Sequence, residues 1–97
     1  MPKVNTLTWN KNAEADMAGF NVYRRLGSKP LPGDVKINAA LVPKDTPTYT
    51  DTVSVDGDYF YEVTAVDTAG NESGFSNFVD IVVNVVPPAP PTGLTVV

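Results

Sequence analysis

The chain has 97 residues, and its seven Lys and Arg against eleven Asp and Glu give a formal net charge of −4. This length supports one small domain with a single core. An acidic balance disfavours nucleic acid and anionic membranes as main partners, because both need a concentrated positive field. The sequence contains no His and no Cys, which excludes imidazole-based triads, thiolate chemistry, Cys/His zinc sites and disulfides.

The composition favours strands over helices. Val and Thr are abundant, and nine Pro and seven Gly interrupt the chain at short intervals. Alternating apolar and polar residues predict six short strands, the spacing of an antiparallel sandwich, at 6–9, 19–26, 35–38, 48–52, 59–65 and 79–83. The clearest pattern has strict period two: Tyr59, Tyr61, Val63 and Ala65. No apolar stretch approaches the roughly 18 residues of a membrane-spanning helix, so no membrane insertion is expected.

The chain changes character after Val86. Residues 87–91 read Pro-Pro-Ala-Pro-Pro, which predicts an extended, semi-rigid segment of ~3.1 Å per residue. Residues 92–97 again have the pattern of a strand, with Leu94 and Val96 on one face. We therefore divide the chain into a body, residues 1–86, and a tail, residues 87–97.

Four segments of the body carry a family resemblance. Residues 7–10 read Leu-Thr-Trp-Asn, and residues 16–24 read Asp-Met-Ala-Gly-Phe-Asn-Val-Tyr-Arg. Residues 57–67 read Gly-Asp-Tyr-Phe-Tyr-Glu-Val-Thr-Ala-Val-Asp and continue into Thr-Ala-Gly-Asn-Glu-Ser at 68–73. In this order they resemble the end of strand B, the start of strand C, strand F and the F–G loop of a fibronectin type III domain. The resemblance covers about residues 4–86 and implies an all-β, immunoglobulin-like antiparallel β-sandwich.

Two positions stand out against this family pattern. Tyr59 occupies the place of the tyrosine corner, whose hydroxyl hydrogen-bonds to the backbone a few residues upstream. The alternative is that Tyr59 is only a core aromatic residue. Asn5 departs from the pattern, because strand B usually carries an apolar residue there.

The two ends of the chain depart from the family pattern more strongly. Nothing before Val4 resembles the family's first strand, strand A, whereas the tail does. The chain therefore resembles a repeat opened in the A–B turn, with a donor strand at Thr92, Gly93, Leu94, Thr95 and Val96 and an acceptor edge at Asn5, Leu7 and Trp9. Return of the tail to its own body is disfavoured, since residues 84–91 span at most ~26 Å against a sandwich height of roughly 30 Å.

The remaining polar residues do not form a recognisable catalytic pattern. Asp56 and Asp58 flank Gly57 in a predicted turn, where acidic residues are common, and no catalytic or nucleotide-binding motif occurs. We expect no enzyme activity, no catalytic residue and no cofactor. Arg24 and Arg25 point to opposite faces of a strand and are interpreted as part of a solvated rim.

One group of loop residues is a weak candidate for calcium. The B–C and F–G loops share one end of the family fold, and their oxygen ligands could converge there. Solvated loop side chains are far commoner, so no metal site is assigned to these residues, which are Glu14, Asp16, Asp67, Asn71 and Glu72. The same loops could instead contact a surface carbohydrate or a protein ligand.

Two functions remain open at this point. In the first, the chain is a structural module that donates its tail to a neighbouring copy and forms a filament or surface array. In the second, it is a spacer or ligand-binding module of a longer extracellular protein or glycosidase, and the tail begins the next domain. Both place the protein outside the cell, at the cell surface or on a virion.

Overall fold

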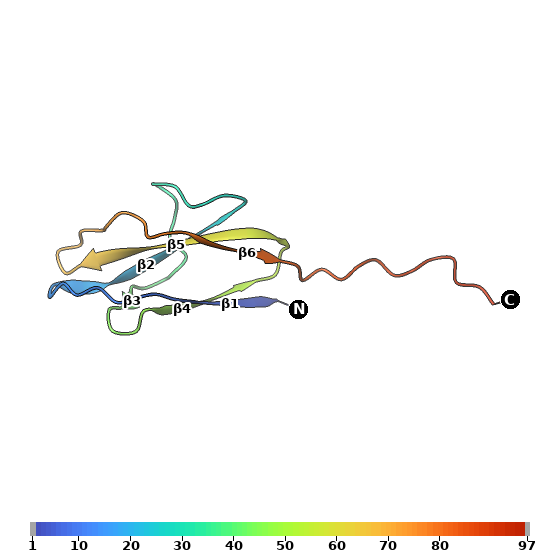
Figure 1. Cartoon of the computed structure of the whole chain (residues 1–97), viewed down its shortest axis with the longest axis horizontal. Coiled ribbons are helices and arrows are strands. Elements are labelled where there is room, and N and C mark those ends of the chain that lie inside the picture. Colours follow the sequence, from blue (N-terminus) through green and yellow to red (C-terminus); the bar gives the residue numbers. More distant parts are fainter. Residues whose placement is uncertain (1, 97) are drawn as a thin grey trace.

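The structure, a computed structural model, describes residues 2–96; Met1 and Val97, the outer limits of the predicted body and tail, lie outside them. The described chain has no helix and six strands: β1 (Lys3–Thr8), β2 (Met17–Leu26), β3 (Val42–Pro43), β4 (Thr48–Val53), β5 (Gly57–Asp67) and β6 (Val79–Val83). They form two antiparallel sheets, β1-β4 and β3-β2-β5-β6. The sheets stack as a sandwich (Figure 1), which confirms the predicted all-β antiparallel class.

The long pair β2 and β5 forms the centre of the structure. Their register runs from Met17 opposite Asp67 to Leu26 opposite Tyr59, with one bulge near the start of β2. Because side chains alternate along a strand, every second residue of each faces the opposite sheet. The core cluster contains the residues that this alternation places inside, namely Met17, Phe20, Val22, Val42, Val53, Tyr59, Tyr61 and Val83. The period-two prediction for residues 59–65 is therefore confirmed for Tyr59 and Tyr61. Val63 and Ala65 pack against the core but are only partly buried, whereas the polar residues Glu62 and Thr64 on the other face are buried.

The strand predicted at 35–38 is wrong. Lys36 makes only an isolated bridge with Tyr23, and the short strand β3 instead pairs with the start of β2. The Asn38 side chain explains the difference, because its Oδ1 accepts the Val22 backbone N–H at 2.8 Å. A side chain thus takes the place of a backbone partner, and the ladder cannot extend there.

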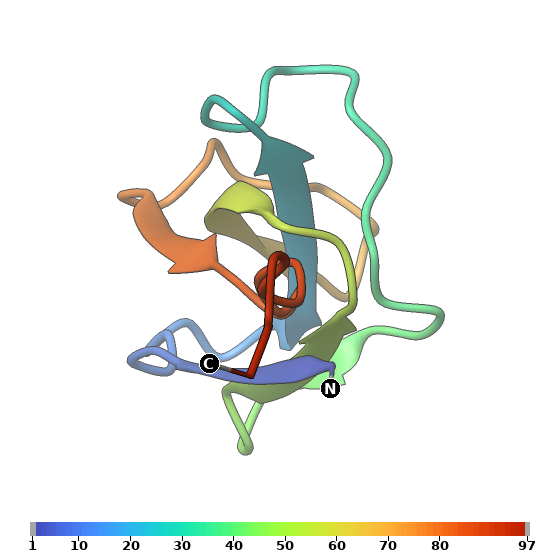
Figure 2. The ribbon, with the colours of Figure 1, turned by 90° about the vertical axis from the view of Figure 1, so that its right-hand side faces the viewer.

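Residues 87–96 of the tail do not pack against the body. They run away from the sandwich along the long axis of the molecule, as Figure 1 shows from the side and Figure 2 from the end at which the tail leaves. Leu94 and Val96 are 96% and 97% exposed. The predicted strand at 92–96 is therefore not formed within this chain, because a strand requires a hydrogen-bonded neighbour. Gly93, at a φ of 74°, also interrupts the extended conformation.

The end of the sandwich from which the tail leaves also holds the turn between β4 and β5. The Tyr59 hydroxyl donates a hydrogen bond to the Val55 backbone carbonyl at 2.7 Å. This is the contact expected of a tyrosine corner, and it fastens the turn to the core through a buried ring. None of the described residues forms a helix suited to crossing a membrane.

Replacing Tyr59 by Phe tests the importance of this contact. The substitution keeps the buried ring but leaves the Val55 carbonyl without its donor, so we expect a loss of ~1–3 kcal/mol in the free energy of unfolding. Urea denaturation monitored by tryptophan fluorescence measures this loss. An unchanged denaturation midpoint would show that the hydroxyl has no structural role.

Candidate functional site

The predicted acceptor residues lie at an edge of the sandwich where both sheets end. Asn5 and Leu7 belong to β1, and Trp9 follows it directly. One edge of β1 pairs with β4, and the other has no strand beside it among residues 2–96. Asn5 contacts β5, whereas β4 contacts β2 through Asp51, so the free edge of β1 lies on the side of β6. Because β6 is itself the last strand of its sheet, both sheets end unpaired on the same side.

A groove runs between these two edges, which we call the edge groove. Its apolar lining consists of Leu7, Trp9, Tyr61, Val63 and Val79, and its polar lining of Thr8, Ser76 and Asn77. Its volume of about 80 Å³ exceeds the roughly 10–15 Å³ that a cavity needs to hold one water. The groove is large enough for part of an aliphatic side chain, with polar side chains beside it.

Beside the groove, part of the inward-facing side of β6 is exposed to solvent. Val79 and Ile81 stand opposite Tyr61 and Tyr59 in the sheet, so all four side chains share the face that points into the sandwich. Nevertheless Val79 and Ile81 are 49% and 37% exposed, whereas Val83 further along the same face is only 1% exposed. Apolar side chains aimed at the core therefore remain in contact with solvent along the edge groove.

Two buried polar atoms near this edge also lack partners. Within residues 2–96 neither Asn5 Oδ1 nor Trp9 Nε1 has a hydrogen-bond partner. The whole Asn5 residue is only 6% exposed. Native structures pair the great majority of buried polar atoms, and an orphaned one costs ~1–3 kcal/mol. Trp9 lines the edge groove and Asn5 belongs to the edge strand β1, while two further orphaned atoms, Asp58 Oδ1 and Glu62 Oε1, lie on β5.

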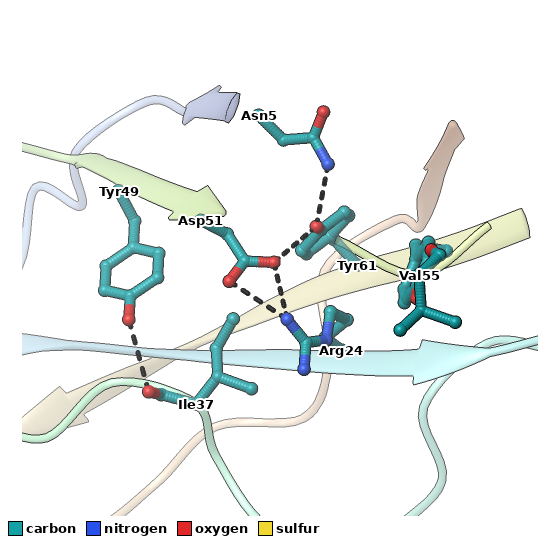
Figure 3. A network of polar contacts seen from close by, with 8 residues as sticks. Asn5, Arg24, Ile37, Tyr49, Asp51, Val55 and Tyr61 are labelled. Atoms are coloured by element: carbon teal, nitrogen blue, oxygen red, sulfur yellow. Dashed lines mark hydrogen bonds and ion pairs between the residues drawn. The ribbon is translucent and has the colours of Figure 1, made fainter. Parts of the chain in front are cut away.

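A polar network fixes the position of β1 over the larger sheet (Figure 3). Asn5 Nδ2 donates to the Tyr61 hydroxyl at 3.0 Å, and that hydroxyl donates to Asp51 Oδ2 at 2.6 Å. Arg24 donates to both oxygens of Asp51, at 3.0 and 2.9 Å. The network thus joins β1, β4, β5 and β2 by charge-assisted hydrogen bonds across the interior. The polar residue at position 5, unusual for the family pattern, has a structural role here.

The interpretation of Arg24 as a solvated rim residue is wrong. Its guanidinium group pairs with Asp51 of the opposite sheet, whereas Arg25 on the outer face lies 3.4 Å from Asp34. The predicted opposite orientation of the two arginines is therefore confirmed, but Arg24 faces the interior. Its partner lies 27 positions away in the sequence, and no local pattern identifies such a pair.

The loop carboxylates have structural partners. Asp67 accepts the backbone N–H groups of Ala69 and Asn71 at 3.0 and 2.8 Å, and these bonds, with that from the Asn71 side chain, lower the pKa of Asp67. Glu72 accepts hydrogen bonds from Thr64, Tyr23 and Asn21, which lower its pKa. Both carboxylates hold the loop that follows β5 against the sheet.

The loop residues considered for calcium lie around one hollow. Glu14, Asp16, Asp67, Asn71 and Glu72 line one shallow hollow of about 360 Å³. Within residues 2–96, however, no group of three or more acidic side chains is arranged to hold a metal ion. Asp56 and Asp58 have different partners. Asp56 accepts a hydrogen bond from the backbone N–H of Val85, and the Asp58 side chain lies beside that of Asp80.

Comparison with known proteins adds no family assignment. No protein-family model matches the chain, and no curated protein or solved structure matches it significantly. The structure by itself establishes an antiparallel β-sandwich with an uncovered edge.

The network at Tyr61 predicts a loss of stability at alkaline pH. Burial, followed by the hydrogen bond to Asp51, raises the pKa of Tyr61 to about 12. In the unfolded chain Tyr61 loses its proton near pH 10, so between pH 10 and 12 the folded state holds more protons. The free energy of unfolding should therefore fall as the pH rises through this range, by an amount on the order of 2 kcal/mol.

A Tyr61→Phe variant isolates this contribution, because the pKa of Tyr23 is also raised and contributes to the wild-type slope. Guanidinium unfolding at several pH values between 9 and 12 gives the two slopes. Equal slopes for variant and wild type would contradict the prediction.

Proposed function

We propose that this chain is a non-catalytic, fibronectin type III-like structural module that assembles head-to-tail. In this proposal residues 92–96 of one copy add as a strand to the free edge of β1 in the next copy. One observation carries the proposal: the same chain combines exposed apolar residues in its tail, Leu94 and Val96, with exposed apolar residues beside the edge groove, Val79 and Ile81. Each of these features is unfavourable in water by itself, and pairing them would remove both.

The direction of the strands favours donation to another copy. Figure 1 shows that β1 begins, and β6 ends, at the same end of the sandwich. A tail folding back from this end onto its own β1 would run parallel to it. A neighbour placed end to end presents the far end of β1 to the tail, which then enters antiparallel to β1 without any reversal.

The order of residues along the tail matches the order of the exposed inward-facing residues of β6, Val79 and Ile81. A strand entering at Trp9 brings Leu94 first, beside Val79, and Val96 two residues later, beside Ile81. Both tail residues lie on one face once Gly93 adopts extended geometry, which glycine does at little cost. Burying each side chain would contribute ~1.5–3 kcal/mol. Ladder hydrogen bonds to the edge of β1 would add ~0.5–1.5 kcal/mol each.

This mode of pairing produces a chain of subunits. The donor and acceptor surfaces differ, so the contact is heterologous and repeats until the subunits run out or a ring closes. The polyproline segment 87–91 would act as a semi-rigid spacer between successive bodies. The partners are other copies of this chain or adjacent fibronectin type III-like domains, in a filament or array at a cell surface or on a virion.

The alternative function is a spacer or ligand-binding module of a longer extracellular protein. The stiff linker followed by a strand-like segment favours it, because consecutive domains of one chain are joined in this way. In that case the edge groove is filled by a segment of the same longer protein. The two functions differ in whether the 97-residue chain associates with itself.

Variants of the tail distinguish these functions. Deleting residues 92–97 should leave a monomer, and Leu94→Asp should have the same effect because it places an unpaired charge in an apolar groove. Thr95→Asp is the matched control, since its side chain lies on the opposite, solvent-facing side of the donated strand. Light scattering over a range of concentrations should show association of the wild type and of the control only.

The deletion variant should also bind a synthetic peptide of residues 90–97. Trp9 is the only tryptophan and lines the edge groove, so its fluorescence should change on binding. A wild-type chain that stays monomeric at high concentration, with a mobile tail by NMR, would contradict assembly and support the spacer function.

A further inference from the structure

The tail leaves the body through a specific contact that the assembly proposal does not use. Asp56 Oδ1 accepts the backbone N–H of Val85 at 2.7 Å and that of Val86 at 3.2 Å. One residue, Asn84, separates β6 from Val85, and Val86 directly precedes the polyproline segment. One carboxylate oxygen therefore holds the last two peptide groups ahead of the stiff part of the tail.

The position of Asp56 is itself well defined. The preceding residue, Val55, is fixed through its carbonyl by the Tyr59 hydroxyl. The following residue, Gly57, begins β5 and pairs with Val83 of β6. Val85 is partly buried against the core on the other side of the contact. Asp56 thus lies between a residue held by Tyr59 and a residue held in the sheet, and its carboxylate contacts a segment that packs on the core.

Such a contact determines the direction of everything that follows it. A polyproline segment of five residues extends ~15 Å with little bending, so an orientation set at Val86 persists to the start of the donor strand. The observed direction is along the long axis and away from β1 of the same chain (Figure 1). Loss of the contact would free the tail to swing about Asn84 and sample the sides of its own body.

We propose that Asp56 is a positioning residue that directs the tail away from its own edge groove and toward that of the next copy. This inference rests on the proposed head-to-tail assembly for its function, but the direction of the tail can be tested without it. A freely swinging tail should favour short species, in which the tail reaches its own body or two copies exchange tails and close. A directed tail favours open chains of subunits.

The direction of the tail is measured best in a monomer. Leu94→Asp prevents assembly, and Thr95→Cys provides a single attachment site for a nitroxide label, because the chain has no native Cys. With Asp56 intact, the label should leave the NMR signals of the β1 amides sharp. With Asp56→Ala, the same amides should broaden as the label approaches the body.

Two variants control this measurement. Asp56→Asn keeps an oxygen that can accept both N–H groups, so it should behave like the intact chain and excludes a general effect of substitution in this turn. Asp45→Ala removes an exposed carboxylate whose Oδ1 lies 3.9 Å from Lys11 Nζ, and should also leave the β1 amides sharp. Unchanged amide chemical shifts in the rest of the body establish that each variant is folded.

Assembly provides the second measurement. In the chain with an unmodified tail, Asp56→Ala should lower the average mass of the assemblies about tenfold at matched concentration, whereas Asp56→Asn should restore it. Binding of the residue 90–97 peptide to a tail-deleted Asp56→Ala subunit should match that of the tail-deleted wild type, because the edge groove is intact.

The outcomes separate the two proposals. If Asp56→Ala leaves both the label effects and the assembly mass unchanged while the peptide still binds, the positioning role of Asp56 is wrong and the assembly stands. If the peptide does not bind the tail-deleted subunit, head-to-tail assembly is wrong. The label measurement then still decides whether Asp56 directs the tail.

Discussion

The core of a β-sandwich must be covered along its whole width, and this requirement governs the structure. β2 and β5 satisfy it at the centre, where Phe20, Val22 and Tyr61 are almost completely buried. At the side of β6 the larger sheet extends beyond the smaller one, so apolar residues that face inward stay exposed. The hydrophobic effect makes this arrangement costly in water. The proposed function follows from that cost, because one added strand beside β1 would remove it.

Polar contacts organise the sandwich around this edge. The Arg24–Asp51 pair, together with Tyr61, holds Asn5 and therefore β1 at a fixed position over the larger sheet. An ion pair of this kind is often no more stabilising than apolar packing, but it favours one arrangement of the groups around it. At one end of the molecule, a second set of contacts through Asp56 orients the tail. The two sets of contacts thus fix the position of β1 and that of residues 85–86 independently of each other.

The two proposed functions, head-to-tail assembly and a tandem domain array, involve the same kind of strand addition. In both, a strand that follows a stiff proline-rich linker completes the sheet of the next body. They differ only in whether the two bodies belong to one polypeptide. Intermolecular pairing must also offset the loss of translational freedom, which covalent linkage avoids. A directed tail reduces the part of this cost that comes from orientation.

Local patterns in the sequence were enough to predict the antiparallel sandwich, the burial of Tyr59 and Tyr61 on β5 and the distinct nature of the tail, because side-chain alternation and proline stiffness act between near neighbours. Other features were decided only by the tertiary structure. Arg24 faces inward because Asp51 lies across the sandwich, and the ladder stops near Lys36 because Asn38 occupies the Val22 N–H. The exposure of Val79 and Ile81 likewise depends on which strand lies opposite them. Such contacts join residues far apart in sequence, where no periodic pattern carries information about them.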